Sequence, residues 1–205
     1  MADITGSQYP TYPSFTSVNF KTVTPAQIST SLSGKMRRVG LGVSYYTWEV
    51  QYPQMEAIDA GTVNGFLGQA LGQVFSFEII LPKLSYSKST NPPSTTPRLS
   101  AAAAIGAKQV SLTNCGNAKT VLAAGDYFKF NNHSKVYMAV SPCVSNSSGA
   151  ATLYFTCPLV SAVPNSTNLT VTAVPFTAVL AEDVQEFSTG IGGITSMSVA
   201  MREVW

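Results

Sequence analysis

The alternation of apolar and polar residues predicts β-strands in the first part of the chain. Residues 45–52 give the clearest strand, whose large side chains share one face: Tyr46, Trp48, Val50 and Tyr52. Residues 74–81 repeat the pattern with Phe75, Phe77, Ile79 and Leu81. Residues 18–52 as a whole indicate successive strands, and Ser33–Gly34 is typical of a turn between them.

Between residues 52 and 74 the apolar spacing changes to that of a helix. In residues 54–71 one stripe contains Met55, Ile58, Val63, Phe66, Leu67 and Leu71. Gly61, Gly65 and Gly68 each lower the helix propensity by up to about 1 kcal/mol relative to alanine. We therefore expect a helix that depends on tertiary packing, with its glycines close against a sheet and its end at Gly72.

The middle of the chain has a different pattern. Residues 82–98 combine four prolines with serine and threonine, which predicts a linker at 83–98. Residues 99–176 contain short β-like segments at a spacing of roughly ten residues, which is typical of a small OB-like or SH3-like barrel. The segments are 110–112, 127–130, 136–140, 153–155 and 169–171, with a hairpin turn at Asn131–Asn132. The expected core is Val110, Leu112, Phe128, Phe130, Val136, Tyr137, Met138, Phe155 and Val171.

The last residues resume the first pattern. Met197, Val199 and Met201 alternate with polar or small residues, and TGIGG at 189–193 predicts a turn before this strand. We infer that one domain of residues 1–82 and 177–205 is interrupted by a barrel of residues 99–176. The predicted fold is mainly β: a β-sandwich or barrel with one packed helix, plus the small inserted barrel.

Composition adds an expectation about assembly. Charged residues make up 11% of the 205 residues, against roughly 25% in typical soluble domains, which predicts a surface covered by neighbouring copies. The formal net charge is +2 and no basic run exceeds Arg37–Arg38, so little supports nucleic-acid recognition. No apolar stretch approaches the roughly 20 residues that cross a bilayer, and the N-terminal sequence lacks a secretory pattern. We expect assembly in a cytoplasm without membrane insertion.

Few residues suit catalysis or a cofactor. His133 is the only histidine, so a two-histidine metal site cannot be assembled, and a serine triad would have to use this residue or another base; we expect an exposed turn residue there. Glu49 and Glu78 could form an acid/base pair, but the polar face of a sheet is their expected place. Three cysteines without CxxC spacing predict buried or half-buried thiols. We expect no catalytic residue, no cofactor and no metal.

The candidate subunit interface comprises three aromatic and three basic side chains. Pro10 and Pro13 favour an extended N-terminal segment that carries Tyr9, Tyr12 and Phe15. These aromatic side chains either pack on their own domain or cross onto a neighbouring copy. Arg37, Arg38 and Arg202 could pair with strand carboxylates at a subunit contact.

Several segments together resemble the siphophage distal tail proteins, which are the hub ring proteins of the baseplate. Similar to their tube-forming domain are YPTYPSFTSVNFKT, YYTWEVQYP, the helix ending in GFLGQALG, VFSFEIILP and the closing VQEFSTGIGGITSMSVAMREVW. The segment AGDYFKFNNHSKVYMAV is similar to a small barrel that is inserted in tail-tip proteins of this kind.

The resemblance implies a structural protein of the virion, located at the phage tail tip. It implies a homo-hexameric ring that joins the tail tube protein to tip or fibre proteins and lets DNA pass without sequence-specific binding. The barrel would hold other tip proteins or bind host saccharide, although it is short for a full carbohydrate-binding domain. The alternatives are a tail tube or tail terminator protein and, in another class, a carbohydrate-binding module.

Overall fold

The computed structural model describes residues 4–190 and 192–205, and these form a mainly β protein with one α-helix, as the sequence predicts. The chain forms two compact units. Unit 1 contains the described residues up to Val23 together with Tyr45–Ile80 and Phe176–Trp205; unit 2 contains Thr24–Ser44 and Leu81–Pro175. The sequence-based domain limits at residues 82 and 177 lie close to the limits of the units, whereas residues 24–44 group with unit 2.

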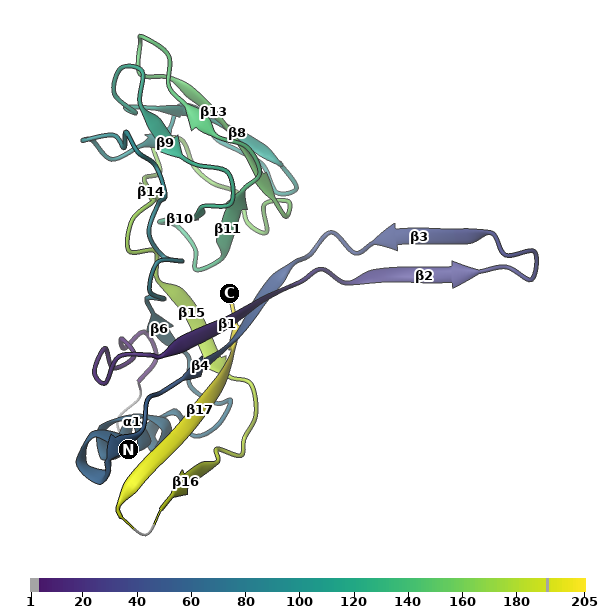
Figure 1. The fold of residues 1–205 in the computed structure, drawn as a ribbon. Coiled ribbons are helices and arrows are strands. Elements are labelled where there is room, and N and C mark those ends of the chain that lie inside the picture. Colours follow the sequence, from purple (N-terminus) through teal and green to yellow (C-terminus); the bar gives the residue numbers. More distant parts are fainter. Residues whose placement is uncertain (1–3, 191) are drawn as a thin grey trace. The chain divides into compact units, whose positions relative to one another are not determined.

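Unit 1 is built on one antiparallel sheet whose strands come from distant parts of the chain. The order is β1 (Ser17–Val23), β4 (Tyr45–Gln51), β17 (Ile194–Glu203), β15 (Phe176–Leu180) and β6 (Phe77–Ile79). Two short strands, β5 (Met55–Glu56) and β16 (Phe187–Thr189), pair with the first part of β17. Figure 1 shows β17 as the long yellow strand that runs beside β4.

Alternating burial along this sheet confirms the predicted strand pattern. Tyr46, Trp48 and Val50 of β4 are buried, as are Met197, Val199 and Met201 of β17. The rings of Phe20 in β1 and Phe176 in β15 lie 5.7 Å apart, although two strands separate β1 from β15. Because those strands would span more than this distance in a flat sheet, the sheet is curled and holds an aromatic core on its concave face.

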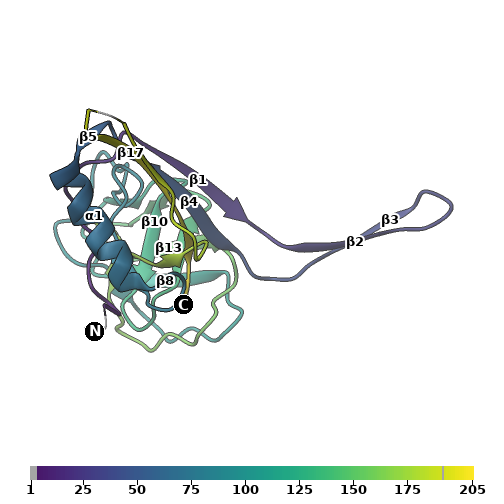
Figure 2. The ribbon, with the colours of Figure 1, turned by 90° about the horizontal axis from the view of Figure 1, so that it is seen from below.

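Helix α1 (Ala57–Ala70) lies beside β5 and β17 (Figure 2). Its buried side chains are Ala60, Val63, Leu67 and Ala70, so alanines form half of the packed face. The predicted stripe is wrong at Ile58 and Leu71, which are 79% and 43% exposed. Apolar residues occur around much of this helix, so their spacing did not single out the face that packs.

The glycines of α1 do not approach the sheet, which corrects a second expectation. A Cβ atom added to Gly61, Gly65 or Gly68 would meet no atom within 4 Å. Gly72, by contrast, has a positive φ of 66° just after the left-handed Leu71 that ends the helix. A Cβ on Gly72 would lie 2.7 Å from Asp183 Oδ1, so a larger residue there would be strained by its conformation and would require Asp183 to shift.

The chain leaves unit 1 after β6 and returns in β15. These two strands are antiparallel neighbours, with Phe176 opposite Ile79 and Ala178 opposite Phe77. The other edge of β15 pairs with β17. The two ends of the inserted segment therefore lie next to each other in one sheet, and β15 is a strand that the sequence pattern had not separated from its surroundings.

Unit 2 contains a small barrel of six strands. Their order is β14 (Leu169–Thr170), β10 (Tyr127–Phe130), β11 (Val136–Ala139), β13 (Ala151–Thr156), β8 (Gln109–Thr113) and β7 (Arg98–Leu99). An antiparallel bridge between Arg98 and Asn168 joins β7 to the start of β14 and closes the sheet. The Leu99 N–H donates to Thr167 O at 3.0 Å across this seam. A pair of short strands, β9 (Thr120–Leu122) and β12 (Cys143–Val144), lies off the main sheet.

The barrel core agrees closely with the sequence. Of the nine expected core residues, Met138 and Val171 are only partly buried and the others are buried. The predicted hairpin turn at Asn131–Asn132 connects β10 to β11. Closure leaves the barrel with no long exposed sheet edge, which is one way that β-proteins avoid unwanted strand pairing.

The predicted linker lies within unit 2 and not between the units. Buried Asp126 accepts hydrogen bonds from Ser87 Oγ at 2.6 Å and from the Lys88 N–H at 3.1 Å. Further along, Asn91 Nδ2 donates to Ala118 O and Thr95 Oγ1 donates to Asn114 O. The polar side chains of residues 83–98 thus hold this Pro/Ser/Thr-rich segment along the barrel. Its composition predicts instead a linker without such contacts.

Residues 24–44 form a hairpin that we call the arm. Its strands β2 (Ala26–Thr30) and β3 (Met36–Gly40) pair with each other in a two-stranded sheet of their own. The predicted turn is present, with Gly34 at a φ of 77° and its N–H donating to Ser31 O. Every residue of both strands is exposed, so the arm is a ribbon with two solvent-facing sides (Figure 1).

Excision of the inserted segment tests the independence of unit 1. We expect a chain in which an Asn-Gly turn replaces Leu81–Pro175 to be soluble, rich in β-structure and cooperative in thermal unfolding, because β6 and β15 then form a hairpin. Circular dichroism and size-exclusion chromatography measure this. The control excision of Phe77–Pro175 also removes β6 and should aggregate. Aggregation of the first product would show that unit 1 needs the barrel.

The three thiols should differ in reactivity. Burial raises the pKa of Cys115 to about 11. The pKa of Cys143 is raised to about 12, mainly by burial and to a smaller extent by the nearby Cys115. Cys157 retains 8% exposure. We expect a disulfide reagent at pH 8 to label Cys157 first and the other two only on unfolding. The Cys157→Ser variant should therefore stay unlabelled when folded; labelling at the wild-type rate would contradict this.

Candidate interaction surfaces

The aromatic residues of the N-terminal segment pack on their own unit. Tyr9 is 2% exposed, and its ring lies against Phe66 and Phe77 at 5.1 and 5.4 Å. The Tyr52 hydroxyl donates to the Tyr9 hydroxyl at 2.9 Å. Half-buried Phe15 contacts Tyr9 and Tyr52. Of the two alternatives for Tyr9 and Phe15, packing within the domain is therefore the one observed.

Backbone pairing explains why this segment stays on unit 1. Gln8 forms a parallel bridge with Glu78 of β6, the Tyr9 N–H donates to Glu78 O at 2.7 Å, and the Glu78 N–H donates to Ser7 O. These bonds cover the outer edge of β6. Tyr12 is 64% exposed and remains the one of the three aromatic side chains that is open to a partner.

The three predicted arginines occupy two different settings. Arg202 lies on β17, where its guanidinium carbon sits 4.4 Å from the centre of the Tyr45 ring in a cation–π contact. Arg37 and Arg38 lie on β3 of the arm and point to opposite faces of it, since neighbouring strand residues alternate. Among the described residues, neither arm arginine has a carboxylate within ion-pair distance.

The arm exposes an unusual concentration of apolar side chains. Six of them are open to solvent: Ile28 (60%), Leu32 (112%), Met36 (54%), Val39 (60%), Leu41 (59%) and Val43 (39%). A two-stranded hairpin by itself is marginally stable in water, and contiguous exposed apolar groups mark interaction surfaces. The sequence signal for this surface is the group of three basic residues Lys35, Arg37 and Arg38 in a segment, residues 24–44, that contains no carboxylate.

The register of the arm divides these groups between its faces. Ile28 is opposite Arg38, and Thr30 is opposite Met36, so Ile28, Met36 and Arg38 share one face. Val39 is opposite Gln27, and Ser29 is opposite Arg37, on the other face. Each face therefore combines apolar contact area with one guanidinium group.

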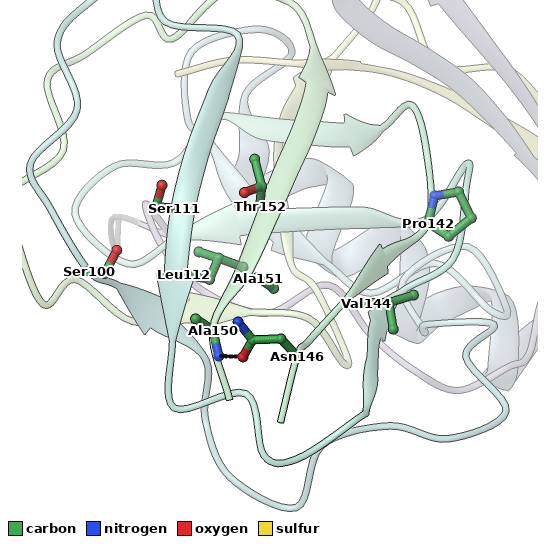
Figure 3. Close-up of a pocket in the computed structure, with 9 residues that line it drawn as sticks. All are labelled: Ser100, Ser111, Leu112, Pro142, Val144, Asn146, Ala150, Ala151 and Thr152. Atoms are coloured by element: carbon green, nitrogen blue, oxygen red, sulfur yellow. Dashed lines mark hydrogen bonds between the residues drawn. The ribbon is translucent and has the colours of Figure 1, made fainter. Parts of the chain in front are cut away.

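The barrel carries an open depression of about 480 Å³ beside β8, β12 and β13. Its lining is uncharged and mixes the polar residues Ser100, Ser111, Asn146 and Thr152 with apolar ones such as Leu112 and Val144 (Figure 3). Asn146 Oδ1 already accepts the Ala150 N–H at 3.0 Å, which holds the loop between β12 and β13. The lining residues include no aromatic side chain, which saccharide sites use for stacking. Tyr154 lies on the same outer face of β13 as Thr152 but outside the depression.

The carboxylates Glu49 and Glu78 are not brought together. Each lies between two buried residues, so both point away from the core, as expected for the polar face of a sheet. Strands β4 and β6 are three strand spacings apart in the sheet order, which is about 14 Å in all at roughly 4.8 Å per spacing. This exceeds the roughly 5–9.5 Å that acid/base pairs of glycosidases require. In the described part of the chain, no three His, Cys, Asp or Glu side chains gather as a metal site would need.

His133 is not an ordinary exposed turn residue, which corrects a further expectation. It is half-buried against the rings of Phe130 and Tyr137. Its Nε2 lies 2.8 Å from the Tyr137 hydroxyl and its Nδ1 lies 2.9 Å from Asn132 Oδ1. Burial, with Lys129 and Lys135 nearby, lowers the pKa of His133.

The hydrogen bonds around His133 fit the neutral form with the proton on Nδ1. The Val160 N–H donates to the Tyr137 hydroxyl at 3.2 Å, so that hydroxyl can donate to Nε2. Asn132 Nδ2 donates to Ala162 O, which leaves its Oδ1 to accept from Nδ1–H. These hydrogen bonds connect the β10–β11 hairpin to residues 160–162, so their role is to hold two parts of the barrel together.

Comparison with known proteins adds no family to these observations. No protein-family model matches the sequence, and no curated protein matches it. No helix among the described residues has the length and apolar character to span a membrane.

The His133 network predicts a dependence of stability on pH. The pKa of His133 in the folded state lies below the unfolded value of about 6.5. The stabilisation of the fold by neutral His133 is therefore fully present above about pH 6.5, and it is lost as the pH falls toward the folded-state pKa. We expect His133→Gln to flatten the fall in the urea midpoint between pH 7 and pH 5. The control Asn132→Ala should lower stability and keep the fall. Equal slopes in all three proteins would contradict this.

Proposed function

We propose that this chain is a ring-forming structural protein of a phage tail tip, located in the virion and without catalytic activity. The observation that carries the proposal is the arm, whose two faces are apolar and cationic and are fully exposed in the single chain. A feature of this kind is stabilised by contact with another chain, because burial of its apolar groups would offset the cost of ordering a lone hairpin.

The architecture is compatible with this role. A curled antiparallel sheet with one packed helix forms a domain that the chain leaves and re-enters through adjacent strands. A compact barrel is thereby presented as a separate unit, which could hold tip or fibre proteins. The resemblance of the sequence to distal tail proteins supplies the specific place: a homo-hexamer between the tail tube protein and the tip, with DNA passing through its centre.

The alternatives find less support in the described residues. A tail tube or terminator protein would form rings through the same kind of subunit contact. It would differ from a hub protein in how many rings stack on one another. A carbohydrate-binding module would need an aromatic platform, and the depression on the barrel has none among its lining residues. An acid/base hydrolase would need paired carboxylates, and Glu49 and Glu78 lie on strands that two others separate.

Removal of the arm tests the proposed assembly. Val23 of β1 is paired with Tyr45 of β4, so an Asn-Gly turn can replace residues 24–44 and join the two strands directly. We expect the full chain to form rings of six and the shortened chain to remain a folded monomer at the same concentration. Mass photometry and negative-stain microscopy measure this, with circular dichroism as the check on folding. A wild-type chain that stays monomeric at high concentration and within virions would overturn the proposal.

A further inference from the structure

The two units carry opposite charge. Unit 1 contains nine of the ten carboxylate residues and only two of the twelve basic residues, Lys21 and Arg202, which gives a formal charge of −7. Unit 2 contains the other ten basic residues and a single carboxylate, Asp126, which gives +9. The small net charge of +2 therefore conceals a strong separation of charge between the units.

Within unit 2 the arm is a cationic segment with no compensating acid. It contains Lys35, Arg37 and Arg38, all exposed, and no carboxylate. Its exposed apolar side chains lie among these cations. A complementary surface must therefore be acidic and must also offer apolar contact area, because unpaired cations would oppose burial of the arm.

Unit 1 has a surface of this description between β15 and β16. Residues 182–187 include the exposed carboxylates of Glu182, Asp183 and Glu186, and beside them Val184 is 77% and Phe187 is 53% exposed. Asp183 Oδ1 accepts the Gln73 N–H, which attaches this segment to the end of α1. A groove of about 350 Å³ adjoins it, lined by Tyr52, Glu186, Phe187 and Met197 among others.

We propose that the arm of one copy docks on the acidic, apolar surface at residues 182–187 of unit 1 in a neighbouring copy. This deepens the proposed ring assembly and rests on it. The arm and its acceptor are different surfaces, so the contact is heterologous, and each copy both gives an arm and receives one. Contacts of this type generate closed rings when the rotation between copies returns to its start.

Ion pairing and apolar burial have separate roles in this contact. Arg37 and Arg38 on opposite faces of the arm select an acidic acceptor whichever face turns inward, while Ile28, Met36 and Val39 supply contact area. Charges at an exposed interface are screened by salt, with a Debye length of about 8 Å at physiological ionic strength. Assembly should therefore weaken as salt rises from 50 to 300 mM.

Charge reversal and its compensation form the test. We expect Arg37→Glu with Arg38→Glu, and separately Glu182→Lys with Glu186→Lys, to weaken assembly of the full chain at least tenfold in mass photometry and sedimentation velocity. The four substitutions combined in one chain should restore rings, because the charges are again opposite. The control Lys83→Glu with Lys108→Glu changes the net charge by the same amount as the arm pair, at exposed sites of unit 2 outside the arm, and should leave assembly unchanged.

The outcomes separate this inference from the proposed function. If the wild-type chain forms rings and both reversed pairs do so equally well, arm docking is overturned while ring assembly stands. If the arm pair abolishes rings but the acceptor pair has no effect, the arm docks on another surface and the inference is also wrong. If the wild-type chain forms no rings under any of these conditions, the proposed function itself falls.

Discussion

The pairing of β15 with two partners is the interaction on which the architecture depends. One edge of β15 binds β6, from which the chain departs, and the other binds β17, which completes the sheet. Phe176, Ala178 and Leu180 of β15 are fully buried in the core of unit 1. Because the strands before and after the inserted segment are hydrogen-bonded neighbours, a closed barrel can be accommodated between them without interrupting the sheet or its aromatic core.

The barrel and the arm show two opposite solutions to the problem of strand edges. The bridge between β7 and β14 closes the barrel, and the side chains of residues 87–95 are hydrogen-bonded along it. The arm keeps both faces and its edges in solvent and carries apolar groups on them. The strand edges of the barrel are thus hydrogen-bonded within the chain, whereas the strands of the arm stay exposed. The arm is therefore the part of the protein best suited to association with another chain.

Charge has the same uneven distribution. A chain with 11% charged residues has few ionic groups, yet nearly all its acids lie in one unit and nearly all its bases in the other. Such a separation favours head-to-tail contacts between copies and disfavours contacts between like units. The proposed ring uses both properties, since the exposed apolar groups supply contact area and the opposite charges set the direction of the contact.

The sequence by itself determined the elements whose signal is local: strand 45–52, the last strand, five of the six barrel strands, the turns at Gly34 and Asn131, and the burial of the thiols. Of the predicted strand 74–81, only Phe77–Ile79 forms a strand, β6, because residues 71–75 turn at the end of the helix. Alternation and turn chemistry depend on near neighbours, so a single chain displays them. Tertiary structure alone decided which face of α1 packs, how β15 joins the sheet, how the barrel closes, and the partners of Tyr9 and His133. Those outcomes depend on pairing and packing between residues far apart in the chain, and no local period records them.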